Sequence, residues 1–122
     1  MPHKNIVWIN GSFDVLEIRH IKLFQKARQM GFPVMVGVGT DEYYQSGDEP
    51  MVFIKPIKDR IEILRSIKYI DGIITFSTDG ELEEIIKAHA PRYMMTNQKD
   101  NQIGSDWVKE IIVVEYNGTH KT

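Results

Sequence analysis

At 122 residues the chain has the length of one ordinary domain, and we expect a single domain over residues 1–122. Apolar residues make up 42% and charged residues 26%, a balance that is typical of folded proteins and excludes a disordered chain. The net charge of −2 gives no general attraction to nucleic acid or to an anionic membrane, and the absence of cysteine excludes disulfides and thiolate metal sites.

The N-terminus does not resemble a signal peptide. Its apolar run, residues 6–9, is short and ends at once in Asn-Gly-Ser. No apolar run in the chain approaches the roughly 18 to 20 residues that cross a bilayer. We therefore expect a cytoplasmic protein whose partners are neither membranes nor nucleic acids.

The first part of the chain is predicted to form a strand, a helix and a second strand. Residues 6–9 and 33–38 are continuous apolar runs typical of strands buried on both faces. Between them, apolar residues recur at helical spacing, at Leu23, Phe24, Ala27 and Met30. This order predicts two parallel strands joined by a right-handed crossover, with the helix beginning near His20 and ending near Gly31.

The alternation continues to the C-terminus. Residues 40–54 are polar and irregular, and a loop of this length is either functional or a mobile connection. Helices are predicted at 56–67 and at 105–109, the latter short, and another helix is predicted to begin at the capping-box pattern of residues 78–81. Further strands are predicted at 73–76, 93–95 and 111–114. The alternation predicts an α/β fold, a three-layer Rossmann-like domain with a parallel five-stranded sheet.

Four segments follow the carboxyl ends of predicted strands. These are residues 10–14, 40–54, 96–98 and the C-terminal tail. In open parallel sheets, ligands bind beyond these strand ends, at the point where the strand order reverses. We therefore expect the four segments to converge on one site.

Residues 10–20 are a glycine turn that leads from the first strand into the first helix. Such a turn offers unpaired backbone N–H groups and the positive end of a helix to a phosphate. Many α/β proteins carry this turn without binding phosphate, and a histidine at a helix start can simply cap or pack. The residues by themselves leave both interpretations open.

The sequence of this turn resembles a known motif. Gly-Ser-Phe-Asp-Val-Leu at 11–16, followed by His20, is similar to Gly-Thr-Phe-Asp-x-x-His-x-Gly-His of cytidylyltransferase-like nucleotidyltransferases. The resemblance continues in order through residues 36–42, 59–64 and 68–71 and covers nearly the whole chain. It is strongest to glycerol-3-phosphate cytidylyltransferases and to adenylyltransferases that form ADP-heptose.

The resemblance implies an activity and its ligands. Members transfer a nucleoside monophosphate from CTP or ATP to a small phosphorylated alcohol or sugar and release pyrophosphate, usually with Mg²⁺ on the triphosphate. We expect CTP rather than ATP from the similarity to the short cytidylyltransferases. The family commonly forms dimers, so we also expect a homodimer.

The resemblance also assigns roles to individual residues. The turn residues that would meet the nucleotide or brace its loop are Gly11, Ser12, Phe13 and Asp14. His20 would donate to the triphosphate, and Arg60 would bind phosphate or the acceptor. Without the motif, Arg60 would be interpreted as a solvated helix arginine.

Two positions depart from the motif. Glu17 stands at the first histidine of the pattern and places a carboxylate beside a polyanion. Arg19 stands at the glycine between the histidines, where the family lets the nucleotide base approach the backbone. Arg19 would either block the base or supply the positive charge that Glu17 removes.

Other departures lie along the rest of the expected site. Relatives carry a lysine near residues 45–48 that is missing here, so Lys55 or Lys58 would reach the phosphates, unless each is a surface lysine. Thr96 belongs to a changed part of the base pocket. Thr119 in the tail would donate to phosphate, unless the tail is an inert terminus.

Other site classes find little support. The four histidines lie far apart without zinc-ligand spacing, and the chain contains no P-loop and no nucleophile elbow, so we expect no protein-bound metal. The leading hypothesis is a nucleotidyltransferase. The alternative, favoured by Glu17 and Arg19, is a catalytically inactive relative that binds a nucleotide or a protein; a dimeric structural protein is a third interpretation.

Overall fold

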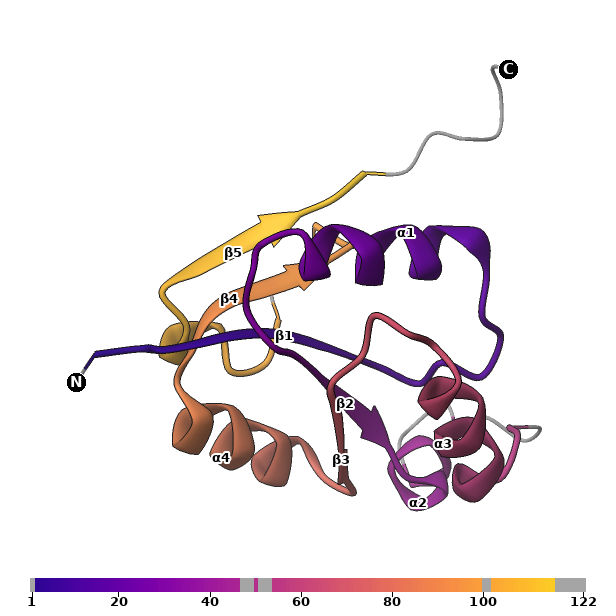
Figure 1. Ribbon diagram of the computed structural model, residues 1–122. Coiled ribbons are helices and arrows are strands. Elements are labelled where there is room, and N and C mark those ends of the chain that lie inside the picture. The colour runs from indigo at the N-terminus through magenta and orange to yellow at the C-terminus, as the bar shows by residue number, and fades with distance from the viewer. Residues whose placement is uncertain (1, 47–49, 51–53, 100–101, 116–122) are drawn as a thin grey trace.

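The computed structural model describes residues 2–46, 50, 54–99 and 102–115 (Figure 1). Its elements in chain order are β1 (Lys4–Gly11), α1 (Ile18–Arg28), β2 (Val34–Gly39), α2 (Asp41–Gln45), α3 (Ile57–Arg65), β3 (Gly72–Phe76), α4 (Asp79–His89), β4 (Pro91–Thr96), the 3₁₀ turn η1 (Ser105–Trp107) and β5 (Glu110–Val113). The α/β alternation predicted from the sequence is confirmed.

All five strands of the sheet are parallel, in the order β3-β2-β1-β4-β5. β1 is central and pairs with β2 through Ile9 and Val36 and with β4 through Trp8 and Met94. The chain runs outward from β1 to β3 on one side and returns to β4 on the other, so the order reverses between β1 and β4. This is the predicted Rossmann-like sheet, and ligands are expected at the carboxyl ends of these two strands.

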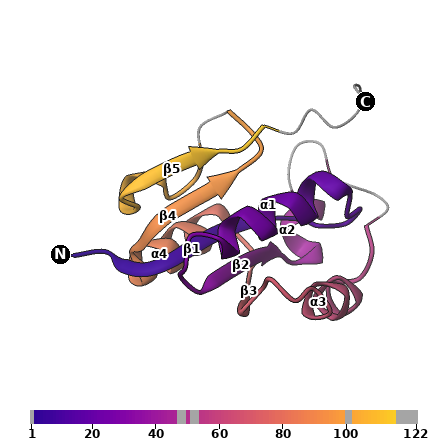
Figure 2. The ribbon, with the colours of Figure 1, turned by 45° about the horizontal axis from the view of Figure 1, so that its top comes forward.

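Helices cover both faces of the sheet (Figure 2). On one face, Leu23 and Phe24 of α1 and Leu64 of α3 pack in a single buried cluster with Val7 and Ile9 of β1. On the other, Leu82 and Ile86 of α4 pack with Trp8, Phe76 and Met94. The strands alternate their side chains between the two clusters, as a sheet buried on both faces requires.

The central tryptophan depends on a glycine in the neighbouring strand. Trp8 is fully buried, and a Cβ at Gly37 would lie 2.5 Å from its ring. Only glycine at position 37 therefore leaves room for the indole against β2. The indole N–H donates to Oδ1 of Asn10 at 2.9 Å, which links the core to the carboxyl end of β1.

Several predicted boundaries need correction. Residues 40–54 are not wholly irregular, because α2 forms there with Thr40 as its cap. Pro56 caps α3 rather than entering it, Pro91 is the first residue of β4, and the short helix at 105–109 is the η1 turn. The capping box is partial: Thr78 accepts from the Glu81 N–H, whereas the Glu81 carboxylate accepts from the Ser77 N–H. Over the described residues, no helix has the length and apolar character needed to cross a membrane.

Candidate functional site

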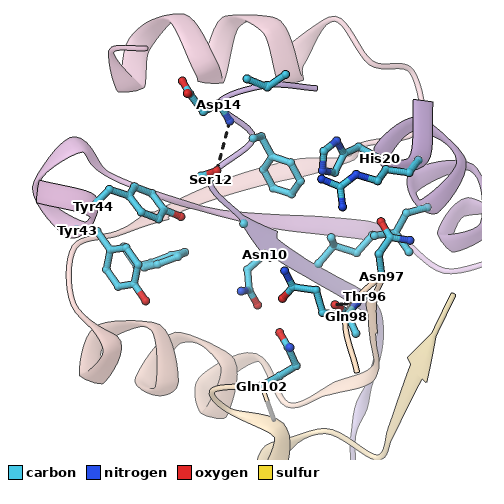
Figure 3. Close-up of a pocket in the computed structure, with 17 residues that line it drawn as sticks. Asn10, Ser12, Asp14, His20, Tyr43, Tyr44, Thr96, Asn97, Gln98 and Gln102 are labelled. Carbon is cyan, nitrogen blue, oxygen red and sulfur yellow. Dashed lines mark hydrogen bonds between the residues drawn. The ribbon is translucent and has the colours of Figure 1, made fainter. Parts of the chain in front are cut away.

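A cavity of about 520 Å³ opens at the carboxyl ends of β1 and β4 (Figure 3). It is lined by Ile9, Asn10, Gly11, Ser12, Phe13, Asp14, Val15, Arg19, His20, Leu23, Tyr43, Tyr44, Phe76, Thr96, Asn97, Gln98 and Gln102. Its volume falls in the range of about 300 to 1,000 Å³ that is usual for small-molecule sites. The cavity therefore lies where the strand order predicts a ligand.

The turn after β1 has an unusual backbone. Phe13 adopts φ +51°, in the left-handed region that side chains other than glycine rarely occupy. Its ring is buried against Phe24, 5.4 Å between centroids, and a Cβ at Gly11 would lie 3.1 Å from it. Strained residues of this kind persist where the surrounding structure fixes them, commonly at functional sites.

Asp14 ties this turn to the segment before α3. Its carboxylate accepts from the backbone N–H of Lys55 at 2.7 Å, and the Lys55 ammonium donates to the Asp14 carbonyl. Asp14 thus occupies the bracing position that the resemblance implies. Lys55 does not line the cavity, because its ammonium lies against Asp14.

His20 lies on the cavity wall at the start of α1. Its Nδ1 accepts a hydrogen bond from the backbone N–H of Glu17 at 2.9 Å, and its ring meets Phe13 edge to face at 5.8 Å. Burial, and then the charge of Arg19, lower the pKa of the imidazole. The neutral ring with Nδ1 accepting carries its proton on Nε2, which leaves Nε2–H as a donor.

The two residues that depart from the motif form an ion pair. Nε of Arg19 donates to the Glu17 carboxylate at 2.7 Å. Arg19 lines the cavity and Glu17 does not. The hydrogen bond and charge of Arg19 lower the pKa of Glu17, so the carboxylate stays ionised and offsets part of the positive charge at the site.

Arg60 lies beneath the site rather than in it. The side chain is fully buried, and its guanidinium donates to Ser12, Gly39, Lys55 and Asp41. Because the side chain has no exposed surface, contact with phosphate or the acceptor, which the resemblance implies, would require a rearrangement around Arg60.

The opposite wall is neutral and polar. It carries four carboxamides, Asn10, Asn97, Gln98 and Gln102. Asn97 donates to the Val114 carbonyl at 2.8 Å, and the Thr96 hydroxyl accepts from the Gln98 N–H at 3.0 Å. The amides of Asn10, Gln98 and Gln102 face a common space in Figure 3. Segments 10–14 and 96–98 were expected at the site from the sequence because they follow strand ends, but on this wall only Thr96 was named as a binding residue. The sequence-based prediction gave no indication of Gln102.

Two tyrosines of α2 also line the cavity; segment 40–54 was expected at the site from the sequence, but the tyrosines were not named as site residues. The Tyr43 hydroxyl donates to Asp79, and burial and this bond raise its pKa. Burial raises the pKa of Tyr44 to about 12, and its ring fills the space where Gly39 has no side chain. Both phenols therefore remain protonated at neutral pH. A five-residue helix gives too short a pattern to predict from sequence.

The structure thus brings together most of the predicted site residues. Those that line the cavity are Gly11, Ser12, Phe13, Asp14, Arg19, His20 and Thr96. Glu17, Lys55 and Arg60 are not among the lining residues, and Thr119 lies outside the described residues. Within the described ranges, no group of three or more histidine, aspartate and glutamate side chains could hold a metal ion.

Comparison with known proteins gives consistent matches. The sequence model of the family described as cytidylyltransferase-like matches residues 8–118. The chain is 32% identical over 119 residues to the bifunctional protein HldE of a Nitratiruptor species, covering 93% of this chain and 25% of that protein. It is 26% identical over 125 residues to the bifunctional protein HldE of Helicobacter hepaticus, covering 100% of this chain and 26% of that one. The chain spans about a quarter of the length of these curated relatives.

A solved structure shares the fold. It is the crystal structure of the lipopolysaccharide core biosynthesis protein from Thermoplasma volcanium, with a TM-score of 0.74 and 20% sequence identity. The match covers 93% of this chain and 98% of that one.

Proposed function

Since the chain belongs to the cytidylyltransferase-like family, we propose that it transfers a nucleoside monophosphate from a nucleoside triphosphate to a small phosphorylated alcohol or sugar, with release of pyrophosphate. CTP is the expected donor and ATP the alternative. In this reaction the acceptor phosphate oxygen attacks the α-phosphorus and the bond to pyrophosphate breaks. Such a displacement needs positioning and charge stabilisation more than a nucleophilic side chain.

The observation that carries the proposal is the wall of the cavity formed by the β1–α1 turn. The start of α1, the Nε2–H of His20 and the side chain of Arg19 all lie on this wall. A helix start attracts anions through its free N–H groups and its dipole. Together these groups suit the charge that develops on the leaving pyrophosphate.

The neutral wall of the cavity suits an acceptor substrate that carries hydroxyl groups. Asn10, Gln98 and Gln102 carry uncharged amide groups, and the cavity is larger than a phosphate alone requires. Hydroxyl groups pair with amides without the cost of burying an unpaired charge. We therefore propose a sugar phosphate or phosphorylated polyol as the acceptor class.

Mg²⁺, a homodimer and a cytoplasmic location belong to the proposal. Asp14 is the one carboxylate among the described lining residues, and it already accepts from Lys55. The residues therefore fit Mg²⁺ that arrives on the triphosphate oxygens better than a metal held by protein ligands, which agrees with the tendency of Mg²⁺ to be bound through substrate phosphates. Mg²⁺ would supply charge neutralisation of the triphosphate.

A second function, nucleotide binding without transfer, is favoured by the Glu17–Arg19 pair. Arg19 is the one lysine or arginine among the described lining residues, and Glu17 offsets its charge at 2.7 Å. A site with this little positive charge would still bind a nucleotide, but it would stabilise the transition state of transfer poorly.

One experiment separates the two functions. Pyrophosphate release is measured with CTP or ATP and Mg²⁺ against a panel of sugar phosphates and glycerol 3-phosphate, with nucleotide binding followed by calorimetry. Release that needs one donor and one acceptor supports transfer; binding without release supports the second function. Neither binding nor release at millimolar nucleotide would reject both.

A further inference from the structure

Arg60 joins four segments that are far apart in the sequence. Its hydrogen-bond acceptors are the carbonyls of Lys55 (2.8 Å from Nε), Gly39 (2.6 Å from one Nη) and Ser12 (3.0 Å from the same Nη), and the carboxylate of Asp41 (2.6 Å from the other Nη). These lie before α3, at the end of β2, in the β1–α1 turn and at the start of α2. A single guanidinium therefore fixes the segments beneath the cavity.

The burial of Arg60 shows that this arrangement is specific. Its side chain is 0% exposed, and the Asp41 carboxylate balances its charge. Across the described residues, no buried side-chain nitrogen or oxygen lacks a hydrogen-bond partner. The planar fork of an arginine can serve several acceptors at once, which a lysine ammonium cannot reproduce at these positions.

The bond to Ser12 determines where the next N–H points. In a trans peptide the carbonyl and the following N–H point in opposite directions. Because the Ser12 carbonyl points to Arg60, the Phe13 N–H points away from Arg60, and both Ser12 and Phe13 line the cavity. In the described part of the chain, this N–H donates no hydrogen bond.

We propose that Arg60 is a positioning residue: it holds the Ser12–Phe13 peptide so that the Phe13 N–H is presented to a phosphate, and it does not touch the nucleotide. Arg60 also keeps Phe13 at its positive φ, because the strained backbone persists only while its surroundings fix it. The role in phosphate binding rests on the proposed function; the role in the shape of the turn does not.

The test combines a ligand-free and a ligand-bound measurement. NMR reports the φ angle of Phe13 without ligand, and titration with tripolyphosphate and with CTP plus Mg²⁺ reports the Phe13 amide shift and the affinity. In Arg60→Lys we expect φ to leave the positive region, the Phe13 amide to stop responding, and affinity to fall by about ten-fold or more, the effect of losing one charge-assisted contact. Arg65→Lys is the matched control, since Arg65 is exposed on the same helix.

A second variant keeps the proposal testable if Arg60→Lys does not fold. Asp41→Ala removes one anchor of the guanidinium, and Glu42→Ala changes the exposed neighbour in the same turn of α2. We expect Asp41→Ala to shift φ of Phe13 and weaken binding, and Glu42→Ala to do neither. Unchanged φ and affinity in the Arg60 or Asp41 variant would overturn the positioning role. If wild type binds neither ligand but φ shifts in the variants, the proposed function fails and the structural role of Arg60 stands.

Discussion

The backbone N–H of Glu17 donates to Nδ1 of His20 at 2.9 Å, so one side of the imidazole closes the start of α1 while Nε2 remains available to the cavity. Substituting His20 with asparagine or with glutamine separates its two roles, acceptance at the start of α1 and donation to the cavity. Asparagine places an acceptor near the position of Nδ1, and glutamine places a donor near that of Nε2.

We expect His20→Asn to stay near wild-type stability and lose about 100-fold in kcat, since it keeps the cap and loses the donor. We expect His20→Gln to retain more turnover and lose about 1 kcal/mol of unfolding free energy, since it loses the cap. Pyrophosphate release and urea unfolding measure the two effects, and His3→Ala is the control. Equal kcat for both amides and wild type would return His20 to a purely structural role.

The lowered pKa of His20 predicts how stability depends on pH. The folded protein binds a proton at His20 less readily than the unfolded chain, whose histidines titrate near about 6.5. Stability is therefore unaffected by this group above that value and falls as pH drops through it toward the lowered folded pKa. We expect the Tm of wild type to fall more between pH 7.5 and 5 than that of His20→Asn. Parallel Tm curves for the two proteins would contradict the assigned shift.

The ion pair of Glu17 and Arg19 sets the charge that a triphosphate encounters at the β1–α1 turn. Arg19 lines the cavity, and Glu17 holds its Nε. We therefore expect Arg19→Gly with Glu17→His, which restores the family pattern, to weaken nucleotide binding by about ten-fold or more, because an arginine contact to phosphate is worth about 1.5 to 3 kcal/mol.

The single change Glu17→Gln separates the effect of Glu17 on the orientation of Arg19 from the effect of its negative charge. It removes a negative charge beside the site, and we expect it to raise triphosphate affinity a few-fold. Calorimetry with CTP plus Mg²⁺ at two salt concentrations measures both effects. Tighter binding in the double variant would instead mean that Arg19 obstructs the nucleotide.

Asp71, in the loop before β3, makes two contacts of different strength, one with β2 and one with α1. One carboxylate oxygen accepts from the buried backbone N–H of Val34 at 2.8 Å, and the carboxylate also pairs with the half-exposed Arg28 at 3.1 Å. Asp71→Ala leaves a buried N–H unpaired, so we expect a loss of about 1 to 3 kcal/mol in unfolding free energy. Arg28→Ala breaks only the exposed pair and should cost about 0 to 1 kcal/mol. Urea unfolding compares the two; an equal loss would locate the stabilisation in the ion pair.

The sequence by itself determined the architecture and the region of the site. The continuous apolar runs that became β1 and β2 could be buried only in a parallel sheet covered by helices, because every face of those strands is apolar. The glycine turn at 10–14 then had to lie at a strand end. Such patterns are local and repeat with a fixed period, which is why Leu23, Phe24 and Ala27 were correctly predicted to face the core.

Only the tertiary structure decided what individual side chains do at the site. In the sequence Arg60 looks like an ordinary helix arginine, yet its partners Ser12 and Gly39 lie 48 and 21 residues away. Tyr43 and Tyr44 reach the cavity because a short helix forms where the sequence looks irregular. These roles depend on which segments meet in space, and on which buried donor finds which carbonyl. Burial and hydrogen-bond pairing between distant segments produce no periodic pattern along the chain. They therefore cannot be predicted from the spacing of residues in the sequence.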